Sequence, residues 1–164
     1  MKKSKLIMLI GNVATGKSTT ASKLYRKGFY IISLDGFRRM LGGGDYVYDR
    51  LIEHVLGISE HYLVENLMNL KINIVIDDAK LVNSEFRKSF ISLAKKYGYI
   101  IECIVMPSIP MKTAVDRRLK NNYSDKFDRK LWESVYQKFE LMTEKPLKSE
   151  GINKISNAGY ISGR

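Results

Sequence analysis

The chain has 164 residues, of which 45% are hydrophobic and 27% are charged, and it contains one cysteine, Cys103. This length suits one domain with one hydrophobic core, and the proportions exclude a disordered or fibrous chain, so we expect a single domain over residues 1–164. The formal net charge of +11 raises encounter rates with polyanions, although it does not identify the polyanion.

The predicted elements alternate along the chain. In chain order they are strand Lys5–Ile10, helix Thr19–Lys27, strand Phe29–Leu34, helix Tyr46–Leu70, strand Ile72–Ile76, helix Ser84–Tyr97, strand Tyr99–Val105, and helices Pro110–Asn121 and Asp128–Thr143. The predicted strands are rich in Ile, Val and Tyr without clean alternation, which is typical of strands buried on both faces. Gly57 leaves open whether Tyr46–Leu70 is one bent helix or two. Residues 147–164 carry no clear pattern.

No apolar run reaches the roughly 20 residues that a membrane-spanning helix needs, and the first run is shorter than that of a signal peptide. Cys103 lies in an apolar stretch, and a lone cysteine cannot form an internal disulfide. These features predict a cytoplasmic protein without a membrane partner.

A glycine-rich loop follows the first predicted strand and precedes the first predicted helix. The loop, which matches G-x-x-x-x-G-K-[ST] in full, reads Gly11-Asn12-Val13-Ala14-Thr15-Gly16-Lys17-Ser18. In such a loop the backbone N–H groups turn toward phosphates, and the helix N-terminus adds partial positive charge. We expect these residues and Thr19 to bind ATP, with Lys17 on the β- and γ-phosphates and Ser18 on Mg²⁺.

Strands and helices that alternate around this loop predict parallel βαβ units. The expected fold class is α/β, a P-loop NTPase or kinase three-layer α/β/α sandwich with a central parallel sheet of four to five strands and a helical lid. The lid is expected at about residues 108–127 and a C-terminal helix at about 128–144.

An acidic residue after the second predicted strand favours a kinase over a GTPase. The stretch Asn153-Lys154-Ile155-Ser156 lacks the acid with which a GTPase reads guanine. A small kinase instead needs a carboxylate that faces the phosphates and accepts the proton of the attacking hydroxyl. Asp35 fits this role because it directly follows the second strand, and in a parallel sheet the strand ends and the loop after the first strand converge on one crevice. If a helix begins at Asp35, Arg38 would project from its first turn toward the same substrate. Alternatively, Asp35 only caps the helix that begins there.

At these residues the chain resembles the kinase domain of phage-type polynucleotide kinases, in which a P-loop is followed by a second strand and Asp-x-x-Arg, here Asp35-Gly36-Phe37-Arg38. The resemblance covers most of residues 5–142. It implies transfer of the γ-phosphate of ATP to the 5'-hydroxyl end of RNA or DNA, with Mg²⁺. Asp35 would be the general base, and Arg38 would hold the neighbouring phosphate of the substrate.

The acidic motif after the third predicted strand departs from this family. The usual Asp-Thr-Asn is replaced by Asp78-Ala79-Lys80, and an additional acid, Asp77, precedes it. Because neighbouring strand residues point to opposite faces, one of Asp77 and Asp78 should face Mg²⁺ and the other should not. The alignment favours Asp78 and the end of the apolar run favours Asp77, so both stay candidate metal ligands.

The expected lid also departs from the family, which places two arginines four residues apart over the nucleotide. Arg117 and Arg118 are followed at that distance by Asn121 and Asn122. We expect Arg117 or Arg118 to steady the charge on the transferred group. Lys120 is the candidate substitute for the missing arginine at the nucleotide. Its ammonium group carries a charge but cannot make the planar, bidentate contact of a guanidinium group.

Two other functions stay open at this stage. One is a kinase of a nucleoside, a sugar or an antibiotic, and the other is a nucleotide-binding regulator without turnover. The sequence does not indicate the oligomeric state.

Overall fold

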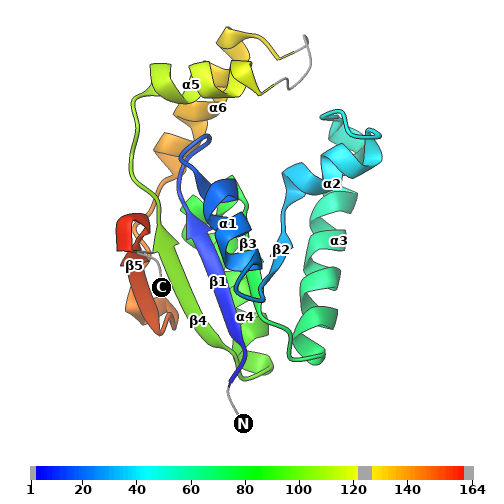
Figure 1. The fold of residues 1–164 in the computed structure, drawn as a ribbon, viewed down its shortest axis with the longest axis vertical. Coiled ribbons are helices and arrows are strands. Elements are labelled where there is room, and N and C mark those ends of the chain that lie inside the picture. The colour runs from blue at the N-terminus through cyan, green and yellow to red at the C-terminus, as the bar shows by residue number, and fades with distance from the viewer. Residues whose placement is uncertain (1–2, 122–126, 161–164) are drawn as a thin grey trace.

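The computed structural model describes residues 3–121 and 127–160, in which five strands form one parallel sheet (Figure 1). The strand order is β2-β3-β1-β4-β5. The strands are β1 Lys5–Ile10, β2 Tyr30–Ile32, β3 Ile74–Ile76, β4 Ile100–Val105 and β5 Lys154–Asn157. The helices are α1 Lys17–Tyr25, α2 Leu34–Leu41, α3 Arg50–Asn69, α4 Ser84–Lys96, α5 Met111–Lys120 and α6 Arg129–Met142.

Helices cover both faces of the sheet. Ile7 and Leu9 of β1 pack with Leu24 of α1 on one face. Leu6 and Met8 pack on the other face with residues of α3 and α4. Both faces of β1 are therefore buried, which explains its continuous apolar run. The three-layer α/β/α sandwich expected from the sequence is confirmed.

The sequence predicted a sheet of four to five strands but did not locate the fifth. β5 lies at one edge of the sheet, where it pairs with β4 from Glu102–Lys154 to Val105–Asn157. Its four residues are half-buried or exposed, so it lacks the apolar run by which the buried strands were found. Within residues 3–121 and 127–160, no helix has the length and apolar character that crossing a membrane requires.

The structure decides where α2 begins and whether α3 is continuous. α3 runs unbroken from Arg50 to Asn69 through Gly57, where an added Cβ would meet no atom within 4 Å. α2 begins at Leu34 rather than at Asp35, and the Ser33 side chain accepts the cap hydrogen bond from Gly36. The alternative that Asp35 serves only as the cap is therefore wrong, because Ser33 already does so.

Candidate active site

The glycine-rich loop joins β1 to α1 with a shape that two of its glycines permit. A Cβ at Gly11 would lie 2.7 Å from Cβ of Met106 and 2.8 Å from Oγ1 of Thr15, so a larger residue does not fit. Gly16 has φ of 95°, in the left-handed region where a side chain is strained. The motif thus forms the tight strand–loop–helix turn that the sequence predicted.

Lys17 is folded back onto its own loop. Its Nζ donates to the carbonyl oxygens of Gly11 at 2.8 Å and Asn12 at 2.7 Å. Burial lowers the pKa of Lys17 to about 8, although the carboxylate of Asp77 acts in the opposite direction. The ammonium group is therefore held at the mouth of the loop by backbone contacts, which incoming phosphates can replace.

The loop is braced by the C-terminal helix. Nδ2 of Asn12 donates to the carbonyl of Tyr136 at 3.0 Å and to the carboxylate of Glu140 at 3.1 Å, both in α6. Asn12 matched only a variable position of the motif, so the sequence offered no signal for this contact.

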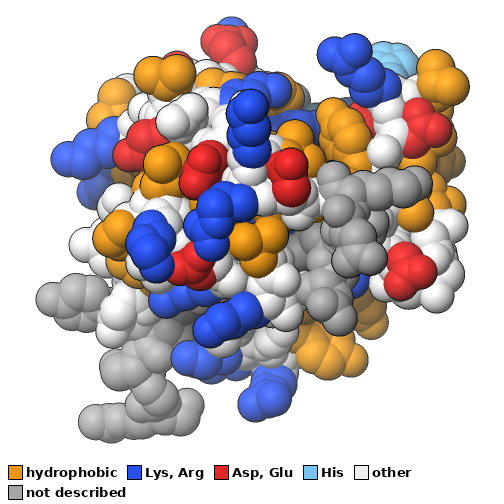
Figure 2. All heavy atoms as spheres, turned by 90° about the horizontal axis from the view of Figure 1, so that it is seen from above, with side chains coloured by type: hydrophobic (Ala, Val, Ile, Leu, Met, Phe, Trp, Pro, Cys, Tyr) orange, Lys and Arg blue, Asp and Glu red, His pale blue; other side chains and the backbone are white. Residues whose placement is uncertain are grey.

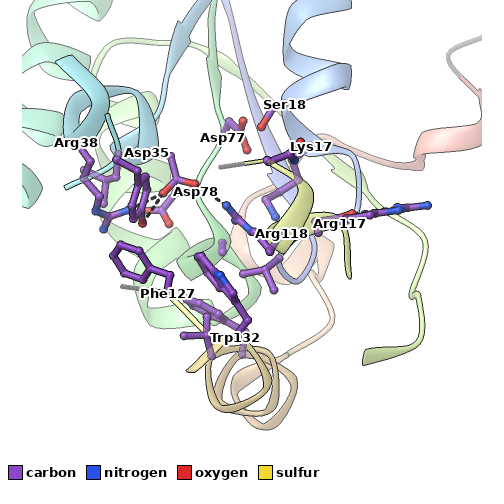
Figure 3. Close-up of a pocket in the computed structure, with 18 of the residues that line it drawn as sticks. Lys17, Ser18, Asp35, Arg38, Asp77, Asp78, Arg117, Arg118, Phe127 and Trp132 are labelled. Atoms are coloured by element: carbon purple, nitrogen blue, oxygen red, sulfur yellow. Dashed lines mark hydrogen bonds and ion pairs between the residues drawn. The ribbon is translucent and has the colours of Figure 1, made fainter. Parts of the chain in front are cut away.

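The two acids after β3 point to different places. In Figure 3 Asp77 lies beside Ser18, whereas Asp78 lies on the side of Asp35. Burial raises the pKa of Asp77, and the Ser18 hydroxyl and the Lys17 charge lower it.

The carboxylate of Asp78 instead accepts the backbone N–H of Lys80 at 2.9 Å and begins a short 3₁₀ turn over Ala79–Val82. Burial, with the nearby Asp78 charge, raises the pKa of Glu60 on α3 to about 8. Asp78 is engaged in this turn, whereas Asp77 lies beside Ser18. Asp77 rather than Asp78 therefore has the geometry to bind a cation together with Ser18.

Asp35 is held by three side chains from different parts of the chain. Its Oδ1 accepts from Nη1 of Arg38 at 2.6 Å and from the hydroxyl of Tyr46 at 3.2 Å. Its Oδ2 accepts from Nη1 of Arg118 at 3.2 Å. Burial alone would raise the pKa of Asp35, but the guanidinium groups of Arg118 and Arg38 hold it below its ordinary value. The carboxylate is therefore ionised and able to accept a proton.

Arg38 is oriented by Glu53, a residue that the sequence reading missed. Nε and Nη2 of Arg38 donate to the two carboxylate oxygens of Glu53 at 2.8 and 2.6 Å, which makes a bidentate ion pair. With Nη1 bonded to Asp35, about two of the five guanidinium N–H donors stay available. Glu53 lies in the first turn of α3, where an acid is expected for helix stability alone, so its role had no distinct signal.

The two lid arginines have different positions. Nη1 of the exposed Arg117 donates to the carbonyl of Ala14 in the P-loop at 3.0 Å. The side chain of Arg118 is only 11% exposed; its Cζ lies 4.9 Å from the ring centroid of Trp132, and it reaches Asp35 (Figure 3). Lys120 and Asn121 line the same cavity as these arginines. Residues 122–126 of the expected lid, with Asn122, lie outside the described residues.

An aromatic contact joins the two sides of the cavity. The ring of Tyr46, between α2 and α3, lies 5.4 Å from the ring of Phe127 in an edge-on contact. Phe127 in turn lies 5.8 Å from Trp132 of α6. Neither Tyr46 nor Phe127 is among the site residues predicted from the sequence, because their proximity depends on the tertiary fold.

Two cavities meet at residues that the sequence predicted for the site. The larger has a volume of about 620 Å³ and is lined by Lys17, Arg38, Glu53, Arg118, Phe127 and Trp132 among others. The smaller, of about 450 Å³, lies between α1 and α2 and is lined by Ser22, Ser33 and Arg39 among others. Ser18, Asp35 and Asp77 line both cavities, so space for ligands exists on two sides of these groups.

Comparisons with known proteins agree with this architecture. A family model described as an AAA domain matches residues 6–142. No curated protein gave a significant match.

Three similar solved structures are a chain of an RNA repair complex and two kinases. A chain of the Pnkp1/Rnl/Hen1 RNA repair complex is 20% identical, with a TM-score of 0.68 over 87% of this chain. This chain spans 46% of that chain's length. The APS kinase of Mycobacterium tuberculosis in complex with AMPPNP and APS is 14% identical, with a TM-score of 0.62, covering 96% of this chain and 90% of that one. Shikimate kinase from Acinetobacter baumannii is 14% identical, with a TM-score of 0.57, covering 93% and 82%. These likenesses show the P-loop kinase fold.

Proposed function

Because the chain belongs to the AAA domain family and has the P-loop kinase fold, we propose that it transfers the γ-phosphate of ATP to the 5'-hydroxyl end of a polynucleotide. Lys17 and the loop from Gly11 to Thr19 bind the triphosphate. Asp35 accepts the proton of the attacking hydroxyl, and Arg38 binds the acceptor phosphate next to it.

The observation that carries this proposal is the position of Asp35. Its ionised carboxylate lines both cavities, with Lys17 in the larger one. A hydroxyl that enters between Asp35 and the P-loop can therefore lose its proton while its oxygen attacks the phosphate. Arg118, bonded to Asp35, is close enough to the same point to stabilise the negative charge of the transition state.

Ser18 and Asp77 are the residues that would hold Mg²⁺. A hydroxyl and a carboxylate suit this hard cation, which usually takes few protein ligands and completes its shell with phosphate oxygens and water. When bound, the ion neutralises charge that develops on the β- and γ-phosphates. Within the described residues no group of three or more acidic, histidine or cysteine side chains forms a metal site, which fits an ion held largely by the nucleotide.

Three features support a polynucleotide acceptor. Arg38 is fixed in orientation and keeps about two N–H donors for a phosphate. The chain carries a net charge of +11, and lysine and arginine side chains are spread over the face shown in Figure 2. The fold resembles that of a chain in an RNA repair complex. Binding to a polyanion through such a surface should weaken steeply as salt rises.

A small-molecule kinase is the second candidate. Tyr46 and Phe127, whose rings are in contact, both line the larger cavity, and an aromatic-lined cavity of this volume suits a small acceptor. Shikimate kinase and APS kinase share the fold. Such an enzyme would phosphorylate a free small molecule and respond little to salt. A third candidate is a regulator that binds ATP without transferring phosphate.

The test is transfer of labelled γ-phosphate from ATP with Mg²⁺ to an oligonucleotide with a 5'-hydroxyl and a 3'-phosphate. Nucleosides, shikimate and APS serve as competing acceptors. We expect labelling of the oligonucleotide, complete loss in Lys17→Ala, and loss of roughly 10²- to 10⁴-fold in Asp35→Asn with ATP affinity retained.

Other outcomes would identify the other candidates. Labelling of a small acceptor alone would replace the polynucleotide by that acceptor. ATP binding without any transfer, together with no functional effect of Asp35→Asn, would favour the regulator.

A further inference from the structure

The outer face of α3 is apolar. Leu51, Val55, Ile58 and Tyr62 expose 83%, 57%, 58% and 71% of their areas, and Figure 1 shows α3 at the outer edge of the molecule. The opposite face of the helix, with Leu56, Val64 and Met68, packs into the protein. A surface helix normally has one apolar face and one polar face, so a helix that is apolar on both is expected to have a second partner.

The same face also lacks charge. Between Arg50 and Lys71 no exposed residue is charged, although 27% of the chain is. The carboxylates of the helix are buried at Glu60 or paired within the chain, at Glu53 with Arg38 and at Glu65 with Lys96. Depletion of charge with exposed aliphatic and aromatic side chains is typical of the centre of a protein–protein interface. A nucleic acid or an anionic membrane would instead require lysine and arginine here.

The spacing of the exposed residues specifies a helical partner. Leu51, Val55, Ile58 and Tyr62 follow one another at intervals of four, three and four, the repeat of a helix–helix seam. We propose that this seam, Leu51-Val55-Ile58-Tyr62, is a homodimer interface in which α3 of one copy packs antiparallel against α3 of a second copy. Two copies that each carry +11 can approach here, since the surface in contact is uncharged.

The seam is self-complementary about a twofold axis between Val55 and Ile58. An antiparallel pair sets Leu51 opposite Tyr62 and Val55 opposite Ile58 of the partner, so apolar side chains meet only apolar ones. Asn69, further along the same face, then lies beyond the overlap.

Exposed apolar residues continue past the N-terminal end of α3. Met40, Leu41 and Tyr48 expose 69%, 56% and 54% of their areas, and α2 contacts α3. Tyr48, however, lines the larger cavity beside Arg38, so this group lies on the α2 side of the site and the seam ends at Leu51.

Sedimentation equilibrium of the full chain tests the dimer. The wild type should fit a monomer–dimer equilibrium across the micromolar range, and the double variant Val55→Glu with Ile58→Glu should be monomeric at every concentration. Asn69→Glu is the matched control, because it adds a charge to the same helix face outside the overlap, and it should still dimerise. Circular dichroism of each variant establishes that α3 is folded.

A disulfide experiment tests the orientation. Equal amounts of Val55→Cys and Ile58→Cys proteins, mixed and oxidised, should give the mixed disulfide, and the native Cys103 is buried and does not compete. Disulfides only between identical variants would overturn the antiparallel arrangement. A wild type that is monomeric throughout, or one that binds vesicles of neutral phosphatidylcholine through Val55 and Ile58 instead of dimerising, would overturn the proposal.

Discussion

Lys17 and Asp35 face one cavity, but they are positioned by different kinds of contact. Lys17 is held by carbonyl groups of its own loop, at Gly11 and Asn12. Asp35 is held by Arg38 on its own helix, by Tyr46 and by Arg118, which lies 83 residues away in the chain. The position of Lys17 is thus set by a local structure, whereas the position of Asp35 is set by contacts that the tertiary fold assembles. Substitutions distant from Asp35 in the sequence should therefore affect the acceptor more than ATP.

The lid arginines give the largest expected difference between the two sides. Arg118→Ala should lower kcat by roughly 10²- to 10³-fold, because it removes a largely buried cation that is bonded to Asp35. Arg117→Ala is the matched control and should have a smaller effect, since Arg117 is exposed and contacts a P-loop carbonyl. Both are measured with saturating ATP and acceptor. Equal losses in the two variants would contradict the distinction.

Glu53 tests whether the acceptor side depends on α3. Glu53→Gln weakens the two-pronged contact to Arg38 and should raise KM for the acceptor about tenfold, the value of one charge-assisted hydrogen bond. KM for ATP should be unchanged. Glu65→Gln on the same helix, whose partner is Lys96, should leave both constants unchanged. A lower melting temperature with a normal KM would mean that Glu53 serves stability alone.

The pH dependence of transfer should report the charge around Asp35. Arg118 lowers the pKa of Asp35, and a general base works only when it is deprotonated, so the wild type should keep its activity to low pH. In Arg118→Ala the pKa of Asp35 rises, and the acid limb of kcat/KM for the acceptor should move to higher pH. A limb that does not move would argue against Asp35 as the base.

The smallest expected effect is the change of ATP affinity with pH that follows from the protonation of Lys17. Its pKa of about 8 means that it loses its proton as the pH of the ligand-free protein rises through that value. Since phosphates bind the protonated form, ATP affinity should be about twofold weaker at pH 8 than at pH 7, as measured by calorimetry. Lys17→Arg stays protonated and should lack this component of the pH dependence.

Much of the fold could be predicted because the signals were local. The buried strands appeared as apolar runs in the sequence. β5 could not be found in this way, since an edge strand with half-buried residues has no apolar run. Glu53 and Phe127 could not be assigned to the site, because an acid in a first helical turn and an aromatic in a loop are both common for structural reasons.

Sequence alone determined the phosphate loop, since its function depends on glycines, a lysine and a hydroxyl that are adjacent in the chain. The pairing of Asp35 with Arg38 was also readable, as residues three apart on a helix are neighbours. Only the tertiary structure decided that Asp77 rather than Asp78 lies beside Ser18, and that Glu53 orients Arg38. These contacts depend on which face of a strand or helix meets which neighbour, and that is decided by packing between elements far apart in the chain.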